Sequence, residues 1–477
     1  MMDVLKKRKE LIIIISLLSL GAVVRILFFN KEGLWYDETL TALSLRMSYF
    51  DMISERLAAG HSPLYFTIIY PLAKVFGTGE IVVRLPSYLV SILSIYIFYL
   101  IAKCLLSDIK FSIIATIFFI LSALNVYFAQ EARMYSFCVL FVLLSFYFLI
   151  RVMGENSLKL WIFYTISTAV ACNLNASTIP LIFAQLAYVL IKREKLLQFI
   201  LSLMAVVILY LPMGFFYLKR EGLDFIEWLS PVTLRTFLEI FYGFGYRPLP
   251  SITETWMPQT VITALEYLSL YFSGALIVWA AVRYFFKFSN KTEHMYKEKD
   301  AAVLLTLWFF LPLVIEYIYS VIKQPLLGPK RYIITLSPAY YLLLGLGLKS
   351  LHWKMLKNAL VIATIVLFTF ALFSFYISPK REDWRSSIAF IDDKLKPGEV
   401  MFGSISTQTM YKYYGANEDL VILDIKYLNA RGFAKGWILL RNIDYQNYSE
   451  LIEDLREVRS LLFIDDYQGI KLYHFER

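Results

Sequence analysis

Long apolar stretches constrain the fold of this chain more than any other feature. About 20 mostly apolar residues cross a bilayer as a helix, because lipid offers the backbone no hydrogen-bond partners. With 58% hydrophobic and only 18% charged residues, the composition is that of an integral membrane protein. We expect a polytopic α-helical membrane protein of about eleven transmembrane helices, at residues 11–29, 81–102, 111–127, 134–150, 159–173, 176–191, 197–216, 262–286, 301–321, 331–348 and 357–377.

Positive charge predicts the orientation of these helices. Lys and Arg gather in alternate loops, at residues 6–9, Lys103 with Lys110, Arg151 with Lys159, 192–195, 283–299, and Lys349 with Lys354 and Lys357. Basic residues favour the cytoplasmic side, so we expect a multi-pass plasma-membrane protein with a cytoplasmic N-terminus. The net charge of +9 is explained in this way, and we expect no nucleic-acid partner.

Two long segments on the predicted outer side suggest that function resides there. They are residues 30–80, where we expect interfacial helices, and residues 217–261, which are rich in aromatic side chains. An odd number of spans also places the C-terminal residues outside. We therefore predict a transmembrane domain over residues 1–377 and an extracytoplasmic domain over residues 378–477.

The tail beyond residue 377 predicts a small α/β domain. Helical spacing or amphipathic pattern indicates helices at 383–395, 407–415 and near 449–459, and short apolar runs indicate strands at 399–404, 419–424, 436–441, 460–465 and 471–475. No glycine-rich phosphate loop follows any of these strands, so we expect no nucleotide site in the tail.

Two adjacent acids follow the first apolar stretch, in "LWYDETL" at residues 34–40. Asp37 and Glu38 could cap the helix that follows, since acids near a helix start accept backbone N–H bonds. Alternatively, one of them is a general base that takes a proton from a hydroxyl acceptor. The residues themselves leave both readings open.

Two further polar groups lie on the same predicted side. His61, in "AGHSPLYF", is either a structural residue or a group that orients a phosphate or a sugar hydroxyl. Glu131 and Arg133, in "FAQEARMYSF", form either a simple ion pair or the lining of a polar cavity at membrane depth.

Lys330 and Arg331 break the positive-inside pattern, because they lie on the predicted outer side. They either extend toward lipid headgroups or clamp a phosphate, for which the arginine fork is well suited. Acids, a histidine and a basic pair thus share one membrane face on four separate segments. An enzyme that takes a phosphate-linked donor from the bilayer would need this set.

Five short motifs occur in a recognisable order. They are "WYDE" at 35–38, "HSPLYF" at 61–66, "VRLPSYL" at 83–89, "EARMY" at 131–135 and "RY" at Arg331 and Tyr332. In these motifs, over roughly residues 10–380, the chain resembles the membrane glycosyltransferases of the C superfold, in the family of protein O-mannosyltransferases and aminoarabinose transferases. Ser62 stands where the family usually has a proline.

The resemblance implies a donor sugar on polyprenyl or dolichyl phosphate, an inverting displacement at the outer face, and a glycan, lipid or protein acceptor. Asp37 would be the base, and Glu38 would tune it or position the acceptor. The remaining substrate-binding residues that it implies, or that lie in its motifs, are His61, Glu131, Arg133, Tyr135, Lys330, Arg331 and Tyr332. It implies no required cofactor, and a divalent metal is not favoured.

Three other functions compete with glycosyl transfer. A flippase for a lipid-linked precursor more often has inverted repeats or broken helices, and we find neither in the sequence. A catalytically silent scaffold does not need the intact acid pair. A phosphoethanolamine transferase usually needs a metal site and a threonine nucleophile in a large soluble domain, and the small tail shows no such cluster. The three cysteines, Cys104, Cys138 and Cys172, have no metal-ligand spacing either.

Overall fold

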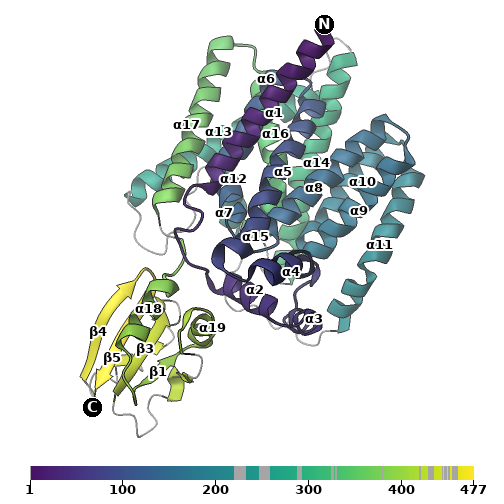
Figure 1. Cartoon of the computed structure of the whole chain (residues 1–477). Coiled ribbons are helices and arrows are strands. Elements are labelled where there is room, and N and C mark those ends of the chain that lie inside the picture. The colour runs from purple at the N-terminus through teal and green to yellow at the C-terminus, as the bar shows by residue number, and fades with distance from the viewer. Residues whose placement is uncertain are drawn as a thin grey trace.

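The structure is a computed structural model of the chain. It describes residues 2–219, 232–245, 258–286, 293–323, 327, 330–378, 380–417, 420–427, 435–442, 444, 448–449, 452–453 and 460–476. A bundle of helices makes up most of the molecule, and a smaller part with a sheet lies at one end of it (Figure 1). Of the predicted outer segment 217–261, residues 220–231 and 246–257 lie outside the described residues.

The bundle contains most of the helices of the chain. They are α1 (Met2–Ile26), α5 (Glu80–Leu106), α6 (Ile109–Leu121), α7 (Ala123–Ala129), α8 (Tyr135–Gly154), α9 (Leu158–Leu174), α10 (Pro180–Lys192), α11 (Leu196–Lys219), α12 (Leu234–Phe244), α13 (Gln259–Phe286), α14 (Glu293–Ile322), α15 (Lys330–Ile333), α16 (Ser337–Ser350) and α17 (Lys354–Ile377). Three short helices follow α1, namely α2 (Tyr36–Arg46), α3 (Tyr49–Ala58) and α4 (Leu64–Phe76).

The chain is a multi-pass membrane protein. Among the described residues, 7 helices are long and apolar enough to cross a membrane, or up to 8 if the bent pair α6 and α7 forms one span. The expected number of eleven is not confirmed, because α9 and α10 are apolar but shorter and α1 is not among the helices that are long and apolar enough. Whether α2 to α4 lie at the membrane interface also stays a prediction.

The predicted third span is bent rather than straight. Helices α6 and α7 meet at 58°, and Ser122 between them has an extended backbone. Its hydroxyl oxygen accepts hydrogen bonds from the Asn125 N–H at 3.2 Å and from the Tyr341 hydroxyl at 2.6 Å. A serine side chain that caps the next helix competes with continuation of the previous one, which explains the bend inside an unbroken apolar run.

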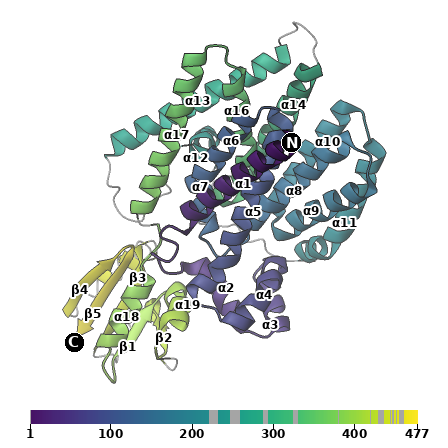
Figure 2. The same ribbon diagram turned by 45° about the horizontal axis from the view of Figure 1, so that its top comes forward.

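The predicted basic loops gather at one end of the bundle, which we call the basic end. There Lys103 pairs with Glu10, Lys349 pairs with Glu298, and Lys192 pairs with Asp300. The opposite end, the tail end, carries α2 to α4 and the C-terminal part (Figures 1 and 2). Which end faces the cytoplasm stays a prediction.

The C-terminal part has the predicted α/β character. It comprises α18 (Trp384–Lys394), β1 (Val400–Gly403), α19 (Ile405–Tyr414), β2 (Ile422–Asp424), β3 (Lys435–Arg441), β4 (Ser460–Tyr467) and β5 (Ile470–Glu476). The strand order is β2-β1-β3-β5-β4; β1 is parallel to β2 and β3, and β5 is antiparallel to β3 and β4. The helix predicted near residues 449–459 lies mostly outside the described residues.

Apolar side chains cover both faces of this sheet. Along β3, Trp437 and Leu439 join one apolar cluster, while Ile438 and Leu440 join another, as expected for a strand whose side chains alternate between faces. Tyr36, the first residue of α2, packs against the cluster that includes Trp437. The sheet-bearing part is thereby attached to the helix that carries the acid pair, and the boundary predicted at residue 377 stays an interpretation.

Candidate functional site

The two adjacent acids at the start of α2 lie in different environments. The Glu38 side chain is 0% exposed, whereas that of Asp37 is 24% exposed. Glu38 accepts a hydrogen bond from the Trp35 N–H at 3.3 Å, so the helix-capping role applies to Glu38. Asp37 faces the more open side.

Glu38 is the centre of a buried ion cluster. Arg84 donates to both of its carboxylate oxygens, at 2.9 and 2.8 Å, and the Ala132 N–H donates at 2.8 Å. Arg381 adds a third charge, with its guanidinium 3.4 Å away. Burial alone would raise the pKa of Glu38, but Arg381 and Arg84 outweigh it and hold this pKa below its usual value. Glu38 therefore stays ionised and joins α2 to α5, to the α7–α8 link and to the segment after α17.

Asp37 lies between two arginines from distant parts of the chain. Arg331 donates to its Oδ2 atom at 3.2 Å, and the Arg133 guanidinium lies 4.0 Å from the same oxygen. The structure therefore brings together three residues that the sequence analysis placed on one face. A carboxylate flanked by arginines is suited to a site where a hydroxyl reacts with a phosphate-linked group.

Glu131 is a buried acid in the link between α7 and α8. Neither of its carboxylate oxygens has a hydrogen-bond partner within the part of the chain that the structure describes. Burial, and then the neighbouring charge of Glu38, raise the pKa of Glu131 to about 8. At neutral pH this side chain is therefore mostly a neutral acid that can donate a hydrogen bond.

His61 lies in the turn between α3 and α4 and is half-buried. Burial, followed by the charges of Arg133 and Arg56, lowers the pKa of His61 to about 4. The imidazole is therefore neutral at physiological pH. It can orient a substrate by one hydrogen bond, but it does not supply positive charge to a phosphate.

The other predicted binding residues differ in how far their side chains are exposed. Tyr332 is half-buried, with the Arg331 guanidinium 5.4 Å from its ring centroid. Tyr135 is buried and packs against Phe128, with ring centroids 4.9 Å apart. Lys330 begins α15, but its side chain lies outside the described residues.

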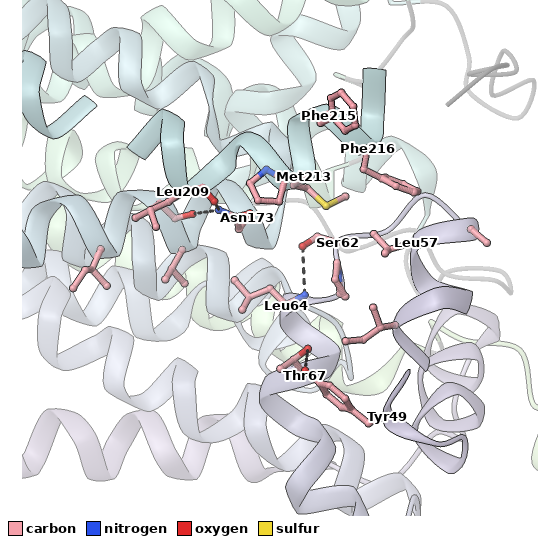
Figure 3. Close-up of a pocket in the computed structure, with 17 residues that line it drawn as sticks. Tyr49, Leu57, Ser62, Leu64, Thr67, Asn173, Leu209, Met213, Phe215 and Phe216 are labelled. Atoms are coloured by element: carbon pink, nitrogen blue, oxygen red, sulfur yellow. Dashed lines mark hydrogen bonds between the residues drawn. The ribbon is translucent and has the colours of Figure 1, made fainter. Parts of the chain in front are cut away.

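An apolar cavity of about 1120 Å³ opens beside the His61 turn. It lies between the segment formed by α3 and α4 and the two helices α9 and α11, and Figure 3 shows Ser62, Asn173 and Met213 on its walls. Leu57, Leu64, Leu209 and Phe216 are among the apolar side chains that line it. The cavity has the chemistry of a site for a hydrocarbon chain.

Two arginines were missing from the predicted site. Arg84 was recognised only as part of a motif, although it is the main partner of Glu38. Arg381 was counted with the tail, yet it also donates to the Gln130 carbonyl at 3.0 Å. A signal for Arg381 was present, because "KRED" at residues 380–383 places basic residues on the face that is otherwise poor in them.

No group of three or more His, Cys, Asp or Glu side chains that could hold a metal ion occurs among the residues described. Glu38 and Asp37 are instead surrounded by arginines. Whether the protein needs a metal stays a prediction.

Fold and site together define a multi-pass membrane protein with a charged cluster at one end of its bundle. Residues 60–217 match the family Dolichyl-phosphate-mannose-protein mannosyltransferase. No curated protein sequence matches the chain.

Two solved structures of ArnT from Cupriavidus metallidurans share the fold over nearly the whole chain. The structure bound to undecaprenyl phosphate gives a TM-score of 0.56 at 12% identity, and the apo structure gives 0.54 at 11%. Both comparisons cover 96% of this chain and 97% of ArnT. The expected resemblance is confirmed: residues 60–217 match the mannosyltransferase family, and the chain shares the fold of ArnT.

Proposed function

We propose that this chain is a membrane glycosyltransferase that takes a sugar from a polyprenyl or dolichyl phosphate and transfers it to a hydroxyl of a protein, lipid or glycan. The family match over residues 60–217 supports this class. The shared fold with ArnT, which was crystallised with undecaprenyl phosphate, supports a polyprenyl phosphate as the lipid of the donor. The apolar cavity beside the His61 turn would hold the first part of the lipid chain.

The observation that carries the proposal is the contrast between Asp37 and Glu38. Glu38 has no exposed surface and is saturated by arginines, whereas Asp37 is partly exposed and only 3.2 Å from Arg331. A base and a phosphate-binding cation would thus lie side by side, as transfer from a phosphate requires.

The reaction would be a single displacement with inversion. Asp37 accepts the proton of the acceptor hydroxyl while the oxygen of that hydroxyl forms a bond to the anomeric carbon of the sugar. The bond between that carbon and the phosphate oxygen breaks, and the electron pair leaves with the lipid phosphate. Arg331 stabilises the added negative charge, and Lys330 would assist it.

Two other groups would orient the sugar. Neutral Glu131 would donate a hydrogen bond to it, because its buried carboxyl has no partner among the described residues. Neutral His61 would offer one donor and one acceptor beside the cavity. Since the basic end would face the cytoplasm, the reaction would occur at the outer face.

A transfer assay tests this function. Membranes that contain the protein would be incubated with radiolabelled polyprenyl-phosphate sugars, and label would be followed from the lipid fraction into any acceptor. We expect transfer from one such donor, none from nucleotide sugars, and a product of inverted anomeric configuration. Movement of intact sugar-lipid across the bilayer without any transfer would instead indicate a flippase.

The cavity gives a second test, in which Leu209→Trp is compared with Leu211→Trp. Both leucines are exposed on α11, but only Leu209 lines the cavity. The indole of the first variant would occupy part of the cavity and narrow it, so we expect a higher KM for a long-chain donor with little change in kcat. If both variants behave alike, the lipid chain lies elsewhere.

A further inference from the structure

One tyrosine of the C-terminal part contacts the loop that leads into Asp37. Tyr414 is the last residue of α19. Its hydroxyl accepts a hydrogen bond from the Leu34 N–H at 2.6 Å and donates one to Glu80 Oε1, also at 2.6 Å. Leu34 lies three residues before Asp37, and Glu80 is the first residue of α5. A single hydroxyl therefore connects three elements.

The close approach of this hydroxyl explains a glycine in the same loop. A Cβ atom at Gly33 would lie 2.9 Å from the Tyr414 hydroxyl oxygen and 3.4 Å from Arg385 Cβ. On the other side, Arg84 donates to the carbonyls of Glu32 and Gly33 at 2.9 and 2.8 Å. The bundle thus holds the carbonyls of Glu32 and Gly33, and the C-terminal part holds the Leu34 amide.

The charge state of the tyrosine suits both of its bonds. Burial, and then the hydrogen bond to Glu80, raise the pKa of Tyr414 far above its usual value. The phenol therefore keeps its proton and donates it to Glu80. Arg385 binds the other oxygen of Glu80 at 3.0 Å and also donates to the Lys31 carbonyl, so two C-terminal residues hold the same carboxylate.

We propose that Tyr414 is a positioning residue, through which the C-terminal part fixes the loop before α2 and hence the place of Asp37 against Arg331. This role rests on the function proposed above. It acts without contact to substrate, since the hydroxyl is occupied by Leu34 and Glu80. An error of about 1 Å in the position of a reacting group can lower a rate by roughly 100-fold, so loosening the loop is expected to slow the chemical step.

The main experiment compares Tyr414→Phe with Tyr413→Phe in the full-length, detergent-solubilised protein. Both changes remove one hydroxyl from the same turn of α19, but the Tyr413 hydroxyl donates to the Thr78 carbonyl at 2.9 Å and does not contact the loop. We expect kcat to fall about tenfold in Tyr414→Phe, with the donor KM unchanged, and to stay at the wild-type value in Tyr413→Phe. Hydrogen exchange of the peptide that contains Leu34 is expected to accelerate in Tyr414→Phe alone.

A double-mutant comparison separates positioning from general damage. Gly33→Ala places a methyl group against the Tyr414 hydroxyl, so it is expected to lower kcat by itself. In Tyr414→Phe the atom nearest to that methyl group is gone, so adding Gly33→Ala is expected to lower kcat little further. If the losses of kcat in the two single variants add up in the double variant, the positioning role of Tyr414 is contradicted.

The outcomes distinguish this inference from the proposed function. If the wild type transfers sugar and Tyr414→Phe keeps its kcat and its exchange rate at Leu34, the positioning role is wrong and the transferase function stands. If kcat and thermal stability fall in parallel in both tyrosine variants, the role of Tyr414 is structural only. If the wild type transfers no sugar from any donor, both proposals fail.

Discussion

Two ion pairs, one at each end of the helical bundle, lie in opposite environments. At the basic end, Lys103 pairs with Glu10, and their side chains are 42% and 34% exposed. At the tail end, Arg84 and Glu38 pair with no exposed surface at all. Water screens the first pair, so it contributes little to stability, whereas the second has lost its water and depends on its partners. The exposed basic residues indicate the orientation of the protein in the membrane. The buried ion cluster marks the candidate functional site.

The largest effect is expected from Glu38→Gln, which breaks the buried cluster. The change leaves Arg84 and Arg381 without their carboxylate, and removal of one partner from a buried ion pair costs about 3–5 kcal/mol. The midpoint of thermal unfolding in detergent should therefore fall strongly. A decrease in the midpoint no larger than that caused by breaking an exposed ion pair would show that the buried cluster does not contribute more to stability than an exposed pair.

A smaller, pH-dependent effect is expected from Glu131→Gln. The folded-state pKa of Glu131 is about 8, against an ordinary value of 4.5. Between these values the folded protein holds a proton that the unfolded chain releases, so this group makes stability fall as the pH rises from 4.5 to 8. Glutamine cannot ionise, so the stability of the variant should decrease less with rising pH. The difference in the free energy of unfolding should be on the order of a few kcal/mol at pH 8 and above.

Unfolding midpoints measured at pH 6 and pH 9 check this prediction. The wild type should lose more stability between the two values than Glu131→Gln does. Equal losses would mean that Glu131 ionises normally in the folded protein.

The smallest effect is expected from Lys103→Met at the basic end. Removal of this exposed partner of Glu10 should change the free energy of unfolding by only about 0–1 kcal/mol. The same thermal measurement applies, and the variant shows what loss of one partner costs when an ion pair is exposed. A loss comparable to that of Glu38→Gln would remove the contrast between the two ends.

Local patterns predicted much of the fold because they depend on neighbouring residues. The predicted helix at 383–395 corresponds to α18, whose start is capped by Asp383 through the Ser386 N–H at 3.1 Å. The five strands among the described residues also lie where short apolar runs placed them. The bend at Ser122 was missed because its cause includes the Tyr341 hydroxyl, 219 residues away.

The candidate site was likewise predictable only where it depends on local sequence. Asp37, Arg133 and Arg331 were predicted to share one face, and the structure places them together. The separate roles of Asp37 and Glu38 could not be read from adjacent letters, because they depend on Arg84 and Arg381. Arg381 lies 343 residues from Glu38, beyond the last apolar stretch. Contacts at that separation arise only when the chain has folded.

We propose that Asp37 is the base and that Glu38 supports it. The most direct test is the single-turnover transfer rate of Asp37→Asn at saturating donor, measured per folded molecule. Loss of a general base predicts a rate about 10²–10⁴-fold below that of the wild type, with an unfolding midpoint close to the wild-type value because Asp37 is partly exposed. A rate equal to that of the wild type would contradict the account and would place the base elsewhere.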